Sequence, residues 1–551
     1  MPALPNLPPG SHVCIVGGGS SGVFAILECL KVGLHPTLYE ATDSSGGVWN
    51  PRQGHWDSLT TNSSFEMMEV CGFPFPFQPS NNFPSRSEIC DYIAAFIDKF
   101  HLSPYIQYDT TVVAVEPTTA PGTNTTLPTR WTVTTSKHHI HFTSYFDAVI
   151  VASGQFNLPK LPLCLTPISL AQSGFAGQVL HSRDFRNGKD YKNLNVLVLG
   201  LGNSSLDVAL ECATVGNAAS VTVACRRGSI LLPVRKDDGN AIDQHVLTRF
   251  FQNVQPSMVK NYRMMAEAQQ ITNAFIKAGM PSPSTGGRDA FISQRVSNLK
   301  EKEQWLKLLM QENSKLSLHS SGLKGVHSGN KCSFFDGSTM DNVDVIISCT
   351  GYVLGKFPFL NHENLMVDCT DRYVVDSTSN GTSNGTSNNE TNNMPPPTAV
   401  TALNLYRRIM HPVHPTLCFL AQFTGFANEA ACAQLQARWI CNTWSSSTLS
   451  LDQMQLECTK RREFWQRSKP LFPQFVTVTR YLDALASDIG CMPPKINHIW
   501  TWLSDPQLAW QLLFGPIVPA QYSLQGDDVT KEVARLSRDL IVGRIKRRSR
   551  L

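Results

Sequence analysis

Two glycine-rich turns of the same kind, about 180 residues apart, constrain the fold of this 551-residue chain more than any other feature. The turns lie at residues 17–22 and 200–205, and each follows a short apolar run rich in β-branched residues. Each turn also precedes a segment in which apolar residues recur at helical spacing. A strand, a glycine turn and a helix in this order are typical of dinucleotide-binding units. Two such units predict an α/β chain with two Rossmann-type domains, and an enzyme that passes electrons between two dinucleotides.

The first turn suits a pyrophosphate that lies on the N-terminus of the following helix. Backbone N–H groups can approach a pyrophosphate only where side chains are absent, and Gly17, Gly19 and Gly22 meet this need, with Ser20 at the helix start. Glu40 lies 23 residues after Gly17, at the end of a predicted second strand. Its carboxylate can accept hydrogen bonds from ribose hydroxyls but would repel a 2′-phosphate. The first turn is therefore predicted to bind FAD.

The second turn is predicted to bind NADPH. The turn residues expected to contact it are Gly200, Gly202, Asn203, Ser204 and Ser205, with serine where the third glycine usually lies. A second apolar run, at residues 220–225, leads directly into Arg226 and Arg227. Guanidinium groups at a strand end suit the 2′-phosphate of NADPH, although two such arginines can also be solvated surface charge. We expect Arg226 to contact the phosphate, and Arg227 to assist it or to face solvent.

The composition indicates a globular protein of two or three domains. Hydrophobic residues make up 42% of the chain and charged residues 16%, and the formal net charge of +4 gives no case for nucleic acid as a partner. The 15 cysteines include no C-x-x-C pair and no His/Cys cluster at metal spacing, so neither a disulfide framework nor a metal site is expected. The N-terminus lacks the plan of a signal peptide, and no apolar run approaches the ~18 residues of a membrane span.

The order of the motifs predicts one domain nested in another, as in the disulfide reductases. Similar buried strands are expected at residues 146–154 and 343–352, on either side of the second glycine turn. Residues 377–398 are rich in Ser, Asn, Gly, Thr and Pro, and are expected to form a flexible surface loop. The predicted domains are an FAD-binding domain at 1–165, an inserted NADPH-binding domain at 166–335, the second part of the FAD-binding domain at 336–545, and a basic tail at 546–551.

Several motifs resemble those of the flavin-containing monooxygenases, a family of class B flavoprotein monooxygenases. Residues 175–185 resemble the family motif F-x-G-x-x-x-H-S/T-x-x-Y/F. Residues 60–68 resemble the T-N-S-S-K-E-M segment, 46–49 the flavin-contacting G-G-x-W, and 349–352 the hinge segment A-T-G-Y. The resemblance runs nearly from end to end. Its departures are Phe65 for Lys, Ser205 for Gly, Ser153 for Thr and Cys349 for Ala.

The resemblance implies further residues for both sites. Those expected at FAD are Gly47, Trp49, Thr61, Asn62, Ser153, Gly154, Thr350 and Gly351. His181 is expected near NADPH, where it would help to tie the nicotinamide domain to the flavin domain without donating a proton. Asn62 matches the family asparagine near the flavin edge, where an amide can donate to a hydroperoxide or to nicotinamide. Without the motif, Asn62 would be interpreted as a turn residue that hydrogen-bonds its own backbone.

The activity implied by the resemblance is the oxygenation of soft nucleophiles with NADPH and O₂. In the family mechanism NADPH reduces FAD, the reduced flavin forms a 4a-hydroperoxide with O₂, and bound NADP⁺ shields it from water. An amine or a sulfide, the small-molecule substrate, then takes the distal oxygen, as in N,N-dimethylaniline monooxygenases. The cofactor performs the hard chemistry, so little acid–base machinery is expected of the protein. A homodimer is a further possibility.

Other flavoprotein functions are weighed against this one. Baeyer–Villiger monooxygenases share the plan, but their motif ends in tryptophan followed by Pro or Asp, where this chain has Phe185 and Arg186. A flavin disulfide reductase would need a redox C-x-x-C, which the sequence lacks. A non-catalytic flavoprotein, or an NADPH oxidase that releases only peroxide, is opposed weakly by the intact segment around Asn62.

The last three residues, Ser549-Arg550-Leu551, are a conservative variant of the Ser-Lys-Leu peroxisomal signal. An import receptor reads this signal at a free C-terminus, and basic residues lie just upstream of it. The alternative is the cationic end of a helix over residues 529–545, in a cytoplasmic protein. We expect peroxisomal import.

Overall fold

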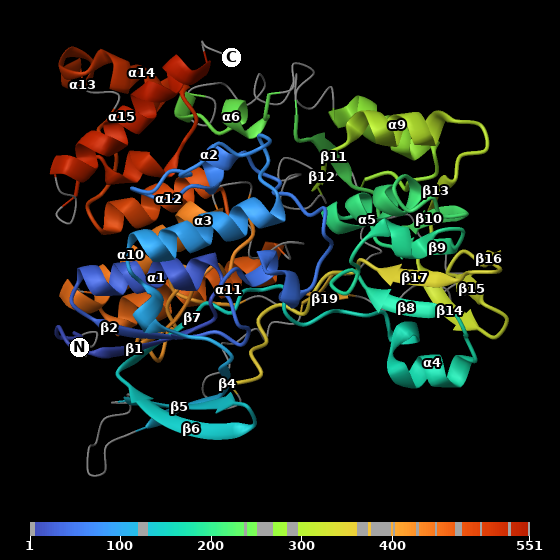
Figure 1. Cartoon of the computed structure of the whole chain (residues 1–551), viewed down its shortest axis with the longest axis horizontal. Coiled ribbons are helices and arrows are strands. Elements are labelled where there is room, and N and C mark those ends of the chain that lie inside the picture. Colours follow the sequence, from blue (N-terminus) through green and yellow to red (C-terminus); the bar gives the residue numbers. More distant parts are fainter. Residues whose placement is uncertain are drawn as a thin grey trace.

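Two five-stranded parallel sheets, one on each side of Figure 1, form the framework of the protein. The structure is a computed structural model. It describes residues 6–118, 130–235, 240–250, 268–283, 296–360, 373–375, 398–400, 403–425, 429–446, 449–468, 476–495, 499–526 and 531–548. Residues 377–397 of the expected loop and the C-terminal tripeptide lie outside these residues.

The first sheet has the strand order β20-β7-β1-β2-β3, and all neighbouring strands are parallel. Both faces of β1 and β7 are buried, which explains their uninterrupted apolar runs. The first glycine turn connects β1 to α1 (Ser20–Lys31), which leads on to β2. The strands are β1 (His12–Val16), β2 (His35–Tyr39), β3 (Ile106–Gln107), β7 (Ala148–Val151) and β20 (Leu417–Phe419).

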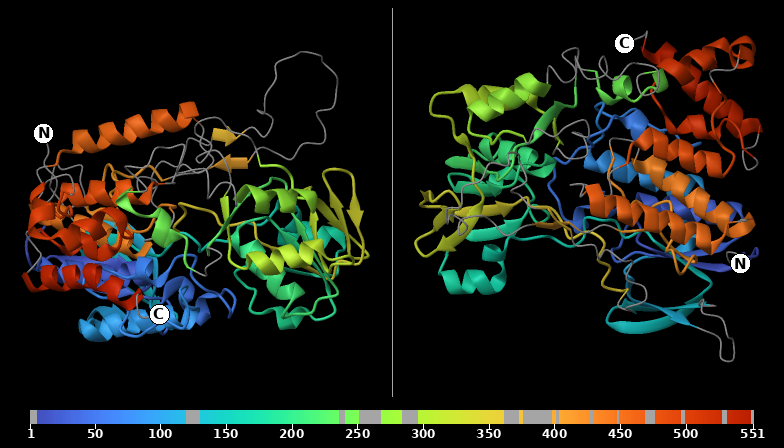
Figure 2. Two further views of the ribbon diagram at one scale, coloured as in Figure 1. Left: turned by 90° about the horizontal axis from the view of Figure 1, so that it is seen from above. Right: turned by 180° about the vertical axis from the view of Figure 1, so that it is seen from behind.

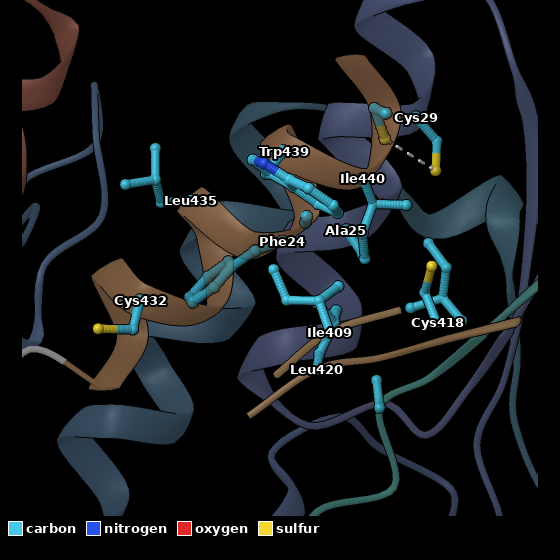
Figure 3. Packing of buried hydrophobic residues seen from close by; sticks show 14 of the residues in the cluster. Phe24, Ala25, Cys29, Ile409, Cys418, Leu420, Cys432, Leu435, Trp439 and Ile440 are labelled. Carbon is cyan, nitrogen blue, oxygen red and sulfur yellow. Dashed lines mark hydrogen bonds between the residues drawn. The ribbon is translucent and has the colours of Figure 1, made fainter. Parts of the chain in front are cut away.

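The helix after the first glycine turn is anchored in the largest apolar core. Figure 3 shows α1 packed against α10 (Glu429–Ser446), with Phe24 and Cys29 of α1 in the same buried cluster as Leu435 and Trp439 of α10. The side chain of Phe24 also meets a third helix, α3 (Arg86–Lys99), by an edge-on contact with Phe96 at 5.0 Å between ring centroids. This packing fixes the position of the N-terminus of α1, at which the predicted pyrophosphate would lie.

The second sheet has the strand order β13-β10-β9-β17-β8 and is also parallel throughout. The second glycine turn joins β9 to α5 (Asn203–Ala213), which packs on β9 and β10. An antiparallel sheet of β14 (Leu323–His327), β15 (Lys331–Phe334) and β16 (Thr339–Met340) lies beside the second sheet. Helix α4 (Pro167–Ser173) contacts β14, and α9 (Lys302–Met310) contacts β13. The parallel strands are β8 (Gln178–His181), β9 (Asn195–Leu199), β10 (Ser220–Ala224), β13 (Leu316–His319) and β17 (Val345–Ser348).

The position of β17 corrects the predicted domain boundary at residue 335. Strand β17 lies inside the second sheet, where it pairs with β9 on one side and β8 on the other. Its apolar sequence therefore reflects burial between two strands of the inserted unit, not a return to the first sheet. We call residues 166–348 the inserted unit and the remainder of the described chain the flavin unit. The two views of Figure 2 show the inserted unit, in green and yellow, beside the flavin unit.

The remaining elements cover the flavin unit or lie between the units. An antiparallel sheet of β4 (Thr111–Thr118), β5 (Arg130–Lys137) and β6 (Ile140–Phe146) extends below the first sheet in Figure 1. The C-terminal helices are α11 (Leu451–Ser468), α12 (Val478–Asp488), α13 (Ile499–Ser504), α14 (Pro506–Phe514) and α15 (Lys531–Arg548). The short elements are α2 (Phe65–Met68), α6 (Asp243–Val246), the pair β11 (Ile230–Pro233) and β12 (Val296–Leu299), and the pair β18 (Tyr373–Val375) and β19 (Thr398–Val400). Among the described helices, none has the length and apolar character needed to cross a membrane.

Candidate cofactor sites and the seam between the units

A cavity of about 210 Å³ opens at the carboxyl ends of β1 and β7, beside the N-terminus of α1. This is the edge of a doubly wound sheet at which ligands usually bind. The structure gathers around this cavity most of the residues predicted to bind FAD. The predicted residues that line it are Gly17, Gly19, Ser20, Glu40, Gly47, Trp49, Ser153 and Gly154.

Close backbone approaches explain the glycines around the cavity. Gly17 has φ of +108°, and a Cβ there would lie 2.8 Å from the carbonyl oxygen of Ala152. A Cβ on Gly47 would lie 3.0 Å from the Cα of Gly19. Gly22 lies outside the cavity lining and instead allows α1 to pack against the turn. No side chain caps the N-terminus of α1, so its first N–H groups suit an anionic ligand.

Glu40 is held in a fixed orientation at the end of β2. Its carboxylate accepts hydrogen bonds from the Gly18 N–H at 2.6 Å and from the Thr42 N–H at 2.9 Å. The Thr42 hydroxyl donates a third bond at 2.7 Å. The side chain is 4% exposed and lines the cavity. A buried carboxylate at this position accepts hydroxyl donors and repels phosphate, so it fits the adenosine half of FAD and not a 2′-phosphate.

Two polar side-chain atoms in the cavity wall have no partner in the protein. Ser153 Oγ and Gln155 Oε1 are buried and make no hydrogen bond, although the Gln155 amide nitrogen donates to the Phe423 carbonyl at 3.0 Å. Buried polar atoms in folded proteins nearly always have a partner. These two atoms therefore fit a ligand with polar edges, such as the isoalloxazine ring of FAD. Ser153 was predicted from the sequence, whereas no motif points to Gln155.

The predicted residues Thr61 and Asn62 lie in a turn at residues 60–64, which we call the Asn62 turn. Thr61 is buried, and its N–H donates to the Pro84 carbonyl at 2.9 Å. Its hydroxyl donates to the Ser63 carbonyl at 2.7 Å. Asn62 is exposed and does not line the cavity described above. The Asn62 side chain is therefore exposed in the region where the flavin unit meets the inserted unit, which we call the seam.

The predicted residues Thr350 and Gly351 follow β17 at the hinge of the inserted unit. The Thr350 hydroxyl hydrogen-bonds with the Ser348 hydroxyl at 2.7 Å and with the Lys160 carbonyl. The Gly351 carbonyl lies 3.0 Å from His181 Nε2. These contacts place Thr350 and Gly351 at the seam and outside the lining of the cavity.

His181, at the end of β8, is buried and holds the hinge through both ring nitrogens. Because Nδ1 accepts the Arg183 N–H at 3.1 Å, Nε2 is left as the donor to Gly351. Burial lowers the pKa of His181, which favours this neutral tautomer. The ring contacts the Tyr352 ring at 5.0 Å between centroids. His181 therefore contacts Gly351 and Tyr352, which follow the inserted unit, and the nearby Arg183 and Arg186 hydrogen-bond further residues of the flavin unit.

The second glycine turn repeats the geometry of the first. Gly200 has φ of +109°, and a Cβ there would lie 2.6 Å from the Cys349 carbonyl oxygen. Gly202 precedes α5, whose N-terminus has no side-chain cap, while Asn203 and Ser204 form its first positions. Ser205 is fully buried in the first turn of α5. This N-terminus suits a second pyrophosphate.

Arg226 lies with two other cations at the end of β10. Arg226 and Arg227 are both exposed. Partial burial of the side chain and the neighbouring Arg227 lower the pKa of Arg226, and partial burial and Arg226 lower the pKa of Lys160. A group of three positive charges beside the second turn fits the 2′-phosphate of NADPH. Lys160 was not predicted from the sequence, because it precedes the inserted unit in the chain.

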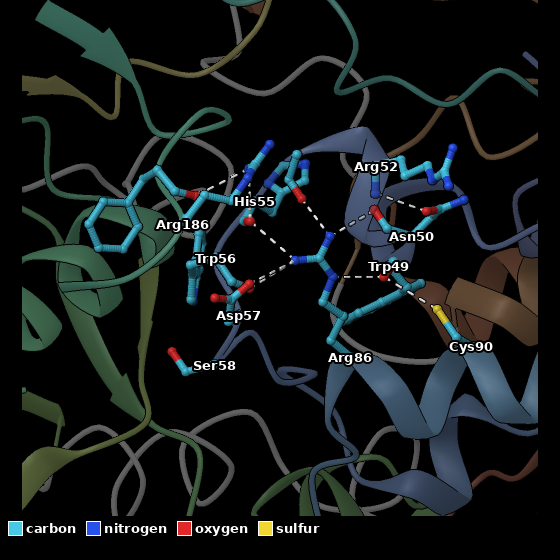
Figure 4. A network of polar contacts seen from close by, with 12 residues as sticks. Trp49, Asn50, Arg52, His55, Trp56, Asp57, Ser58, Arg86, Cys90 and Arg186 are labelled. Carbon is cyan, nitrogen blue, oxygen red and sulfur yellow. Dashed lines mark hydrogen bonds and ion pairs between the residues drawn. The ribbon is translucent and has the colours of Figure 1, made fainter. Parts of the chain in front are cut away.

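A buried arginine that sequence reasoning missed holds the loop beneath the cavity. Figure 4 shows the Arg86 guanidinium at the centre of residues 49–57. Its Nε donates to the Trp49 carbonyl at 2.8 Å, and Nη2 donates to the Asn50 and Gly54 carbonyls, both at 2.7 Å. Its Nη1 reaches two more carbonyls, those of residues 55 and 56, at 3.2 and 3.3 Å. The backbone that carries Trp49 is thereby fixed by one side chain of α3.

The same loop binds the inserted unit through its backbone. The His55 N–H donates to the Arg183 carbonyl at 2.6 Å, and the Asp57 N–H donates to the Arg186 carbonyl at 2.8 Å. Arg186 Nη1 returns a hydrogen bond to the His55 carbonyl at 3.0 Å. Burial, together with Arg86, Arg183 and Arg186, lowers the pKa of His55 to about 4. His55 is therefore neutral at physiological pH and adds no charge to this cationic seam.

Comparison with protein families identifies one match that spans most of the chain. The model of the flavin-binding monooxygenase-like family matches residues 10–375 and 399–547. Flavin-containing monooxygenase 3 of Rattus norvegicus is 29% identical over 532 residues, which cover 93% of this chain and 89% of the rat protein. The putative dimethylaniline monooxygenase [N-oxide-forming] 6 of Homo sapiens is 30% identical over 542 residues, covering 94% of this chain and 89% of the human protein.

Solved structures of flavoprotein monooxygenases share the fold. An S-allyl-L-cysteine S-oxygenase from Allium sativum superimposes with a TM-score of 0.57 at 18% identity, covering 97% of this chain and 99% of the plant chain. Cyclohexanone monooxygenase from Rhodococcus sp. Phi1, solved with NADP⁺ bound, gives a TM-score of 0.59 at 14% identity. The superposition covers 88% of this chain and 98% of the cyclohexanone monooxygenase chain. The predicted nested α/β fold is thereby confirmed.

Proposed function

This chain belongs to the flavin-binding monooxygenase-like family, and from that premise we propose that it transfers one oxygen atom of O₂ to an amine or a sulfide. As a member of this family it is a flavoprotein monooxygenase that uses FAD and NADPH. The names of its curated relatives include N-oxide-forming enzymes, and a structural neighbour is an S-oxygenase. These names support nitrogen and sulfur as the atoms to be tested first.

The observation that carries this proposal is the cavity at the N-terminus of α1. Glu40, Ser153 and Gln155 present polar atoms there, and the uncapped helix supplies N–H groups for a pyrophosphate. FAD bound in this cavity supplies the activation of O₂, and NADPH supplies the two electrons that the reaction consumes. Glu40 would orient the ribose, while Ser153 and Gln155 would hydrogen-bond the flavin ring.

The inserted unit would hold the nicotinamide cofactor throughout turnover. The N-terminus of α5 would receive its pyrophosphate, while Arg226 and Lys160 would pair with its 2′-phosphate. By holding the nicotinamide cofactor in place, these residues would help to exclude water from the flavin site, which protects an oxygenating enzyme from wasteful release of peroxide. The hydrogen bonds of His55 and Asp57 to the inserted unit fix the two sites relative to each other.

Asn62 is assigned to the reacting side of the flavin. Its exposed amide can donate one hydrogen bond and accept another at the seam between the units. The resemblance of residues 60–68 to the family motif supports this assignment, and hydrogen bonds from the N–H and the hydroxyl of Thr61 hold the turn. Asn62→Ala is expected to keep FAD but to lose oxygenated product, with NADPH oxidation either slowed or diverted to peroxide.

A substrate screen tests the proposal. The purified holoenzyme is given NADPH and O₂ with a tertiary amine, a thioether or a cyclic ketone, while NADPH loss, product and peroxide are measured together. N-oxide or sulfoxide close to one equivalent per NADPH supports the proposal. Lactone from the ketone, in preference to either product, would assign the chain to Baeyer–Villiger chemistry. Peroxide alone from all three substrates would make the protein an NADPH oxidase.

A further inference from the structure

We propose that Lys300 and Asp243, two residues of the inserted unit, are positioning residues that hold the Asn62 turn at its two ends. The inference rests on the proposed function, because it concerns the residue assigned to the reacting side of the flavin. It explains how the nicotinamide cofactor, bound at α5, can influence the position of a side chain that belongs to the flavin unit.

On the flavin-unit side, backbone hydrogen bonds hold the Asn62 turn. The Thr61 N–H donates to the Pro84 carbonyl at 2.9 Å, and the Phe65 N–H donates to the Asn82 carbonyl at 2.9 Å. These bonds leave the Thr60 carbonyl and the Ser64 N–H to other partners. Both partners are side chains of the inserted unit, more than 170 residues away in the sequence.

Lys300 binds the first end of the turn and the dinucleotide helix at the same time. Its Nζ donates to the Thr60 carbonyl at 3.0 Å and to Asp207 Oδ2 at 2.8 Å. Asp207 lies in α5, the helix that starts at the second glycine turn. The side chains of Lys300 and Asp207 are only 12% and 17% exposed. An ion pair shielded to this degree is costly to break on one side, because the remaining charge stays buried.

Asp243 binds the other end of the turn. Its Oδ2 accepts the Ser64 N–H at 2.7 Å, while Oδ1 is buried and has no partner. Burial, together with Glu66 of α2, raises the pKa of Asp243 to about 6, against the lowering effect of hydrogen bonds from Ser64 and Gln244. A half-satisfied buried carboxylate destabilises a fold. The presence of Asp243 at this buried position is explained if its negative charge is needed to fix the backbone of the Asn62 turn.

Lys300 and Asp243 both follow strands of one pair, β11 and β12. Lys300 directly follows β12 and Asp243 begins α6 after β11, and these two strands pair with each other. The Val234 N–H extends this pairing with a bond to the Leu299 carbonyl at 3.2 Å. A shift of the β11–β12 pair with α5 would therefore move both ends of the Asn62 turn together. Binding of NADP⁺ at α5 is expected to order the turn.

A double-mutant cycle tests whether these residues act through Asn62. Lys300→Met and Asp243→Asn are compared with Lys307→Met and Asp98→Asn, which change exposed side chains of the same types. Each of the first pair should lower product per NADPH at least threefold with FAD content retained, and the controls should not. In the Asn62→Ala background the same substitutions should cause no further loss. Losses that multiply with that of Asn62→Ala would overturn the proposal.

Hydrogen exchange of the peptide that contains residues 60–64 gives a readout independent of activity. NADP⁺ should slow this exchange in the wild type and in both controls, and should have little effect in Lys300→Met and Asp243→Asn. Exchange is expected to be about tenfold faster in the variants than in the wild type. Unchanged exchange in both variants would overturn the proposal.

The two proposals fail in different ways. If the wild type makes no oxygenated product, the proposed function is wrong, and the hydrogen-exchange experiment alone decides the positioning role. If Lys300→Met does not bind FAD, Asp243→Asn decides, because asparagine keeps the size of the side chain and removes the negative charge that the proposal requires.

Discussion

The α-carbon of Gly22 faces the carbonyl oxygen of Gly17, so that a Cβ on Gly22 would lie 2.0 Å from that oxygen. A contact this short requires the backbone of α1 to move away from the turn. Gly19 differs, because a Cβ there would meet the Cα of Gly47 at 3.5 Å, an ordinary contact. The two glycines of the same motif therefore have different functions, one in packing and one in keeping the cavity open.

Substitution of each glycine should separate these functions. Gly22→Ala should lower the free energy of unfolding by about 1–3 kcal/mol or more, as overpacked cores do. Gly19→Val should leave thermal unfolding of the apoprotein nearly unchanged but reduce the FAD content, because a branched side chain would occupy the cavity. Thermal scans and the visible flavin absorbance measure the two effects. Full flavin content in Gly19→Val would contradict the assignment of the first site.

Arg226 should determine the choice between NADPH and NADH. One charge-assisted contact contributes about 1.5–3 kcal/mol, or roughly tenfold to 150-fold in affinity. Arg226→Ala should raise the KM for NADPH by such a factor and leave the KM for NADH almost unchanged. Arg227→Ala should have a smaller effect, since Arg227 is expected to assist or to face solvent. Equal losses for both cofactors would show that Arg226 does not bind the 2′-phosphate.

The sequence predicted those parts of the site that depend on local chain geometry. Gly17, Glu40 and Gly200 occupy the expected places because a strand, a glycine turn and a helix form one short-range unit. The boundary at 335 was wrong because β17 carries the same apolar pattern that a central strand of either sheet would carry. Ser205 stands where the third glycine of such a turn usually lies, and its hydroxyl donates a hydrogen bond to the Gly202 carbonyl at 2.8 Å.

Contacts between distant segments could not be predicted from the sequence. In the sequence, Arg86 resembles any charged residue at the start of an amphipathic helix. In the structure it is only 5% exposed and donates hydrogen bonds to the loop that contains Trp49. Lys160 and Lys300 likewise have no local signal, since their partners are brought near by the docking of the two units. The contact between buried Arg86 and the loop of Trp49 is formed only in the folded chain.

Removal of the Arg86 guanidinium should destabilise the loop of residues 49–57, which carries Trp49 beside the FAD cavity. Arg86→Met would leave several buried carbonyl groups without their donor, and each buried polar group left unsatisfied typically costs about 1–3 kcal/mol. We expect a lower thermal midpoint and release of FAD at lower temperature, measured by flavin fluorescence. Arg52→Met is the control in the same loop, because Arg52 makes a largely exposed ion pair with Asp43 and such pairs contribute about 0–1 kcal/mol. Equal effects of the two substitutions would contradict this role of Arg86.

Asp243 should make the stability of the protein depend on pH in a way that its amide variant does not. Its pKa is about 6 in the folded protein, above the ordinary value of 3.8, because of burial and then Glu66. Between these two values the folded state holds a proton that the unfolded state has lost, so stability falls as the pH rises from about 4 to 6 and stays lower above 6. About two pKa units correspond to roughly 3 kcal/mol.

Asp243→Asn removes this titration, so the variant should be more stable than the wild type at pH 8, by up to about 3 kcal/mol, and the difference should vanish near pH 4. The lowered pKa values of His55 and His411, about 4 and 3, affect both proteins equally and cancel in the difference. Urea unfolding of both proteins from pH 4 to 8, with Asp98→Asn as a flat control, measures it. A more stable variant that also yields less product per NADPH would show that the buried carboxylate is retained for function at the expense of stability. A difference independent of pH would show that Asp243 titrates at its ordinary pKa.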